Sequence, residues 1–177
     1  IQSLQKYPEP IAVLGRSFGG VLALLACADA PLSIRALVTL AAPHPTRRAR
    51  LLRFLLPLIG LFRKTVPKPW VRPEERVMRY EVGRHVAFPV PALREFFRTL
   101  SLLTPERLQM VRTSALILHG EADVVADPSA AAYLYQSLGS TQKKLCLIPN
   151  VGHTPETLHA HPTLLRELRE FLKSALH

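Results

Sequence analysis

A serine flanked by glycines stands near the start of the sequence, in Gly15-Arg16-Ser17-Phe18-Gly19-Gly20. The apolar run 11–14 before it is typical of a strand, and the run 18–28 after it is typical of a buried helix. A serine on such a sharp strand-to-helix turn presents its hydroxyl at the carboxyl end of a sheet, where it can act as a nucleophile. Side chains two positions before and after the serine would collide with neighbouring backbone, which explains the glycines. We therefore predict that Ser17 is a nucleophile.

The amide of Phe18 follows the serine directly and lies at the N-terminus of the predicted helix. Backbone amides at a helix N-terminus point outward and favour negative charge. We expect this amide to donate a hydrogen bond to the oxyanion that forms when the serine attacks a carbonyl group.

A serine hydroxyl needs a base, and the base needs an acid that orients it. On a strand–turn–helix serine the expected chain order is serine, acid, histidine. His153 follows the last predicted strand, and Asp123 follows the strand before it, so both face the same edge as the serine. Asp127 is a second candidate for the acid, although its place before Pro128 is typical of a helix N-cap.

The other histidines fit different roles. His119 stands at the end of a strand and is interpreted as a structural histidine with satisfied hydrogen bonds, whereas His44 follows a strand and could line the entrance of the crevice. No H-E-x-x-H motif, no cysteine pair at zinc spacing and no glycine-rich phosphate loop is present. We predict no metal site and no cofactor.

Four short apolar runs, at 11–14, 36–41, 115–118 and 144–148, have the composition of strands buried on both faces. Helical patterns lie between or after them, at 18–28, 128–138 and 163–176. This alternation predicts an α/β fold with a parallel sheet. The segment 44–112 interrupts it with helical patterns at 51–62, 74–82 and 90–103. We predict core regions at 1–43 and 113–177 and a mostly helical insertion at 44–112.

The net charge of +10 belongs to the insertion. Of the 23 basic and 13 acidic residues, 15 basic and 5 acidic ones lie between His44 and Arg112, so the remaining charges balance. No zinc-finger spacing or RNA-binding aromatic pattern accompanies the arginines, which favours a solvated helical face over a nucleic-acid site. A weak contact with an anionic surface stays open.

The 177 residues form one domain by size. Two cysteines, Cys27 and Cys146, are too few for a disulfide framework, so we expect a reducing, cytoplasmic location. No apolar run reaches the roughly 18 residues of a membrane span, and no signal peptide is visible. Because the first residue is Ile, we expect the natural N-terminus to lie upstream.

Taken with these motifs, the chain resembles the α/β-hydrolases, and among them the bacterial carboxylesterases and monoacylglycerol lipases. The points of similarity are the Gly15–Gly20 turn, the 118–123 turn, the 131–138 helix and Gly152-His153. The family core has about eight strands and this sequence shows about four, so the resemblance implies the C-terminal part of such a fold. The missing part normally carries the second oxyanion donor.

The resemblance implies a serine hydrolase that cleaves a small ester through Ser17, His153 and Asp123 and an acyl-enzyme. The insertion would be a cap over the acyl pocket, and the substrate-binding candidates are Arg16, His44, Leu55 and Leu58. A thioesterase, peptidase or acyltransferase would use the same triad. A catalytically silent module or fragment with this fold is the alternative of a different class. The sequence does not indicate an oligomeric state.

Overall fold

A computed structural model of the chain describes residues 10–29, 34–68, 87–153 and 161–176. The chain divides into two compact units, one containing 1–44 and 102–177 and the other containing Pro45–Ser101. The insertion was predicted at 44–112, whereas the second unit ends at Ser101. Helix α5 (Pro105–Met110) belongs to the first unit. The predicted helix at 74–82 lies outside the described residues.

The first unit is built on a parallel sheet of four strands in the order β1-β2-β5-β6. They are β1 (Ile11–Arg16), β2 (Ile34–Leu40), β5 (Ser114–Gly120) and β6 (Lys143–Ile148). All three strand pairs are parallel, so the carboxyl ends of the strands meet at one edge. The prediction of an α/β fold with about four parallel strands is confirmed.

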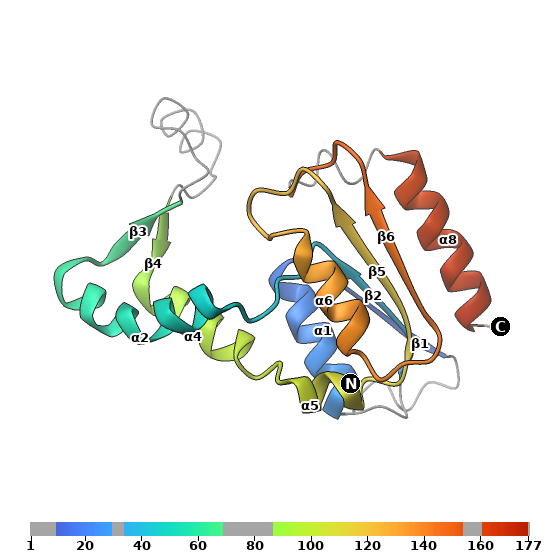
Figure 1. The fold of residues 1–177 in the computed structure, drawn as a ribbon, viewed down its shortest axis with the longest axis horizontal. Coiled ribbons are helices and arrows are strands. Elements are labelled where there is room, and N and C mark those ends of the chain that lie inside the picture. Colours follow the sequence, from blue (N-terminus) through green and yellow to red (C-terminus); the bar gives the residue numbers. More distant parts are fainter. Residues whose placement is uncertain (1–9, 30–33, 69–86, 154–160, 177) are drawn as a thin grey trace. The chain divides into compact units, whose positions relative to one another are not determined.

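Helices cover both faces of this sheet (Figure 1). Helices α1 (Phe18–Asp29) and α6 (Ser129–Ser137) lie on one face, and α8 (Pro162–Leu176) lies on the other. The central strands β2 and β5 are buried at nearly every position, which explains their continuous apolar sequences. Under α8 the buried core consists of Val38, Leu40, Leu116, Leu118, Ile148, Val151 and Leu164.

The second unit pairs α2 (Arg47–Phe62) with α4 (Val90–Leu100) and adds a short antiparallel hairpin of β3 (Thr65–Pro67) and β4 (Ala87–Pro89). The sequence pattern placed the start of α2 at Leu51, four residues late. Thr46 caps the helix instead, since its hydroxyl accepts a hydrogen bond from the Ala49 amide at 3.0 Å. The three-residue strands β3 and β4 are too short to give a periodic signal.

Both cysteines are free. Cys27 is fully buried in α1, and burial raises the pKa of its thiol to about 12, with a hydrogen bond from Thr113 opposing that rise. This thiol is therefore a core group and not a nucleophile. Within the described ranges, none of the helices is long and apolar enough to cross a bilayer.

Candidate active site

Ser17 stands on the turn between β1 and α1 in a left-handed backbone conformation, with φ of 51°. This region is costly for a residue with a side chain and is found at sites where the surrounding structure enforces it. Two backbone hydrogen bonds hold the turn: the Ser17 amide donates to the Leu40 carbonyl at 2.8 Å, and the Gly20 amide donates to the Ser17 carbonyl at 2.9 Å. The hydroxyl is thereby presented at the carboxyl edge of the sheet.

Glycine is required at one of the two motif positions but not at the other. A Cβ at Gly15 would lie 2.2 Å from the Gly19 carbonyl oxygen, as expected for a turn this tight. A Cβ at Gly19 would meet nothing within 4 Å, so the expected collision there is wrong. The close contact falls one residue later, because α1 brings Gly20 against Ala42. A Cβ added at Gly20 would lie 2.6 Å from the Cβ of Ala42.

Replacing Gly15 by alanine is expected to lower the free energy of unfolding by about 3 kcal/mol, since backbone must move to admit the methyl group. Gly19→Ala is the matched control in the same turn. It should raise stability by up to about 1 kcal/mol, because alanine favours the helix and the space is open. Urea denaturation of both variants measures this difference, and equal effects of the two would contradict the packing argument.

Ser17, His153 and Asp123 form a continuous hydrogen-bonded chain. His153 Nδ1 lies 2.7 Å from Asp123 Oδ2, and His153 Nε2 lies 3.0 Å from Ser17 Oγ. A carboxylate only accepts, so Nδ1 carries the hydrogen and Nε2 is left to accept from the serine hydroxyl. These distances allow a proton to pass from the serine to the imidazole.

The loops after β5 and β6 hold Asp123 and His153 close together. The Glu121 amide donates to the Ile148 carbonyl and the Ala122 amide to the Val151 carbonyl, each at 3.0 Å. A Cβ at Gly120 would lie 2.1 Å from the Val151 oxygen, so only glycine permits this approach. Asn150 then turns the chain toward His153 with φ of 59°, a conformation that asparagine tolerates.

The Asp123 carboxylate is buried and fully engaged. Its Oδ1 accepts from the amides of Val125 at 2.8 Å and Ala126 at 2.9 Å. Burial by itself would raise the pKa of this carboxyl, but hydrogen bonds from His119, His153 and the two amides outweigh burial and hold the pKa well below its usual range. Asp123 is therefore a carboxylate at neutral pH.

The second candidate for the acid, Asp127, bonds a backbone amide, whereas His153 bonds Asp123. Asp127 is exposed, and its Oδ1 accepts from the Ser129 amide at 2.8 Å at the start of α6. That bond lowers the pKa of the Asp127 carboxyl. The N-cap of α6 is Pro128, one residue later than the sequence indicated.

Two of the predicted substrate-binding residues, Arg16 and His44, belong to the first unit, and Leu55 and Leu58 belong to the second. Arg16 donates from Nη1 to the carbonyl of His153 at 3.0 Å, so it braces the loop that carries the base. The His44 ring stacks on Tyr133 with centroids 4.7 Å apart, and burial lowers the pKa of His44 although Asp127 opposes it. Leu55 and Leu58 lie in α2 of the second unit, 41% and 56% exposed. Phe18 is the first residue of α1.

One participant was missed from the sequence. His119 was interpreted as a histidine with satisfied hydrogen bonds, but it lies beside the acid, with Nε2 3.3 Å from Asp123 Oδ2. Its Nδ1 is buried without a hydrogen-bond partner in the part of the chain that the structure describes. The only sequence signal for this contact is the four-residue spacing between His119 and Asp123. That spacing does not predict a contact, because the contact depends on how the loop after β5 folds back.

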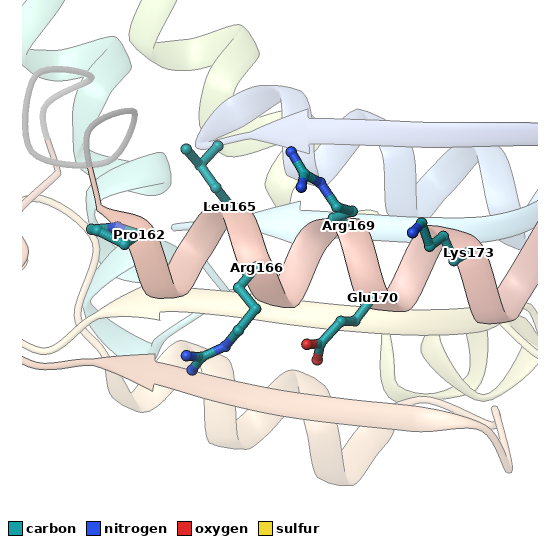
Figure 2. Close-up of a pocket in the computed structure, with 6 residues that line it drawn as sticks. All are labelled: Pro162, Leu165, Arg166, Arg169, Glu170 and Lys173. Carbon is teal, nitrogen blue, oxygen red and sulfur yellow. The ribbon is translucent and has the colours of Figure 1, made fainter.

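A groove of about 490 Å³ lies along α8, and Figure 2 shows the residues that line it. Leu165 and Arg169 extend from one side of the helix, and Arg166 and Glu170 extend from the other. Its lining comes from 162–173 alone and contains no nucleophile or histidine. Within the described ranges, no group of three or more His, Cys, Asp or Glu side chains could hold a metal ion.

Comparison with known proteins gives consistent results. The family described as serine aminopeptidase, S33, matches residues 1–157. The monoglyceride lipase of Rattus norvegicus is 29% identical over 196 aligned positions that cover all of this chain and 60% of that protein. The chain thus spans less than two thirds of the length of this relative.

Solved structures share the fold. The monoacylglycerol lipase of Paleococcus ferrophilus superimposes with a TM-score of 0.70 at 16% identity, over 99% of this chain and 71% of that one. A soluble variant of the monoglyceride lipase of Saccharomyces cerevisiae, in complex with a substrate analogue, gives 0.69 at 16% identity, over 99% and 65%.

Proposed function

We propose, since the chain belongs to the serine aminopeptidase S33 family within the α/β-hydrolase superfamily, that it is a serine hydrolase that cleaves carboxylic esters. The observation that carries the proposal is the hydrogen-bonded series from Ser17 through His153 to Asp123, on a turn with a left-handed serine. Three side chains of the required types and in the required order meet at one edge of the sheet.

The proposed mechanism has two half-reactions. Ser17 Oγ attacks the ester carbonyl while its proton passes to His153 Nε2, and the Phe18 amide stabilises the oxyanion. The bond to the alcohol breaks as His153 returns the proton to the leaving oxygen, which leaves an acyl-enzyme. Water then attacks the acyl carbon with His153 as base, which releases the acid and restores the serine. Asp123 keeps the Nδ1 hydrogen of His153 in place throughout.

Lipid esters such as monoacylglycerols are the proposed substrates. The support is the relative named monoglyceride lipase, of which this chain spans 60%. We further propose that Leu55 and Leu58, which are exposed apolar residues of α2, contact the acyl chain.

Peptide hydrolysis is the second candidate, and the description of the family as serine aminopeptidases favours it. The same triad cleaves amides, whose nitrogen leaving group needs protonation by His153. The two functions differ in the leaving group, so matched p-nitrophenyl ester and aminoacyl p-nitroanilide substrates separate them.

A fluorophosphonate probe tests the proposal directly. We expect covalent labelling of the folded chain at the peptide that contains Ser17, together with turnover of p-nitrophenyl esters in a series of acyl lengths. Cleavage of the anilide without the esters would assign a peptidase. A chain that is folded by circular dichroism but shows neither labelling nor turnover would contradict a catalytic role and favour a silent module.

A further inference from the structure

His119 is a buried imidazole that the mechanism does not use, although it touches the acid. The residue is 1% exposed near the end of β5. Its Nε2 lies 2.9 Å from the Ala126 carbonyl oxygen and 3.3 Å from Asp123 Oδ2. Because both oxygens can only accept, Nε2 carries a hydrogen that is directed at the carbonyl and shared with the carboxylate.

The surroundings of this imidazole place a hydrogen on Nε2 and offer no partner for one on Nδ1 among the described residues. Its Nδ1 is buried and has no partner among the described residues, so a second hydrogen there would be an unpaired buried donor. A buried donor without a partner carries the full cost of removing it from water. Among the described residues, His119 contacts Asp123 and interacts by charge with Asp127, and His153 bonds the same Asp123 carboxylate.

We propose, building on the proposed function, that His119 is a positioning residue that locks the Asp123 carboxylate toward His153. Two backbone amides donate to Oδ1, His153 donates to Oδ2, and His119 Nε2 lies 3.3 Å from Oδ2, so rotation of the carboxylate would break all of these contacts. The bond from His119 to the Ala126 carbonyl also fixes the turn that supplies those amides. The acceptor for the His153 Nδ1 hydrogen therefore stays in place while the imidazole gains and loses its second proton.

Two substitutions separate the donor function of His119 from its bulk. His119→Leu keeps a side chain of similar size without a hydrogen-bond donor, and His119→Gln keeps an amide donor near the position of Nε2. We expect the Leu variant to lower kcat on a short p-nitrophenyl ester at least about tenfold. This is the typical loss when a residue that orients a functional side chain is removed. KM should change less than about twofold, because no substrate contact is lost. The Gln variant should recover most of kcat.

A spectroscopic measurement reports on the same contact without turnover. The Nδ1 hydrogen of His153, held by Asp123, should give a low-field proton resonance in one-dimensional NMR. We expect this resonance to broaden or vanish in His119→Leu and to persist in His119→Gln.

Thr39→Val is the matched control. Thr39 is fully buried on the neighbouring strand β2, opposite Ile117, and its hydroxyl has no partner within the described ranges. Valine removes this polar group without touching Asp123. We expect kcat and the His153 resonance to be unchanged in this variant.

The outcomes decide separately on the two proposals. A folded His119→Leu variant that keeps the wild-type kcat and His153 resonance would overturn the role of His119. An equal loss of kcat in the Leu and Gln variants, together with a lower Tm in both, would also overturn it, because the effect would then follow from stability. If the wild-type chain shows no turnover dependent on Ser17, the proposed function fails. The resonance then still decides whether His119 holds the carboxylate.

Discussion

Replacing Ser17 by alanine is expected to abolish fluorophosphonate labelling and to lower kcat for ester hydrolysis by about a million-fold, the loss typical of a removed nucleophile in serine hydrolases. Alanine lacks the oxygen that His153 Nε2 faces at 3.0 Å, so no acyl-enzyme can form. The residual rate would come from water acting at a site that still binds substrate. Stopped assays at high protein concentration, with labelling followed by mass spectrometry, measure both effects.

The double variant Ser17→Ala/His153→Ala sharpens this test. Because the nucleophile and the base act as one unit, the second substitution should cost almost nothing once the first is made. Ser174→Ala, at an exposed serine of α8, is the control and should keep full activity and labelling. Labelling that persists in Ser17→Ala would contradict the assignment of the nucleophile.

The second large effect is expected for Asp123→Asn, which should lower kcat by about ten-thousand-fold. Two backbone amides, from Val125 and Ala126, occupy Oδ1, so the asparagine must place its carbonyl oxygen there. Its amide nitrogen then takes the position of Oδ2 and donates to His153 Nδ1. The imidazole must carry its hydrogen on Nε2, which can no longer accept the proton of Ser17.

Asp127→Asn is the control for this substitution. Asp127 is exposed and bonds the start of α6, so its replacement should change kcat by no more than about threefold, within the range of surface substitutions. Similar kcat losses in the two variants would contradict the choice of Asp123 as the acid.

The Asp123→Asn substitution should also change how the stability of the protein depends on pH. The pKa of Asp123 is lowered on folding, so the unfolded chain binds the proton more tightly than the folded chain does. The carboxylate therefore stabilises the fold at pH values above the unfolded pKa of about 3.9, and this contribution is lost as the pH falls toward the lower folded pKa. Asp123→Asn should unfold at a lower temperature at pH 6 and show a shallower fall in Tm below about pH 4.

The catalytic candidates could be predicted because their signals are local. The run Gly15–Gly20 combines a strand, a tight turn and a helix within a few residues, and the structure places the left-handed residue at Ser17. Asp123 and His153 each follow a buried strand, and parallel strands bring such loops to one edge. The position of each residue directly after a parallel strand therefore limited which side chains could come together.

The environment of each candidate could not be predicted, because it depends on residues distant in sequence. The open space at Gly19 and the contact at Gly20 depend on Ala42, at the end of another strand. Arg16 is predicted to bind substrate, and the structure shows that its guanidinium also reaches a carbonyl 137 positions away, on the loop of His153. Neither contact leaves a periodic or compositional pattern.

By itself the sequence determined the parallel α/β core and the chain order of the candidate nucleophile, acid and base, because apolar periodicity and turn chemistry are properties of short segments. Only the tertiary structure decided how the acid is held. The loop after β5 folds back so that one carboxylate receives two amides and two imidazoles, one of them from His119. Hydrogen bonds between distant segments form only when folding brings their backbones together, and the local sequence pattern does not show which segments come together.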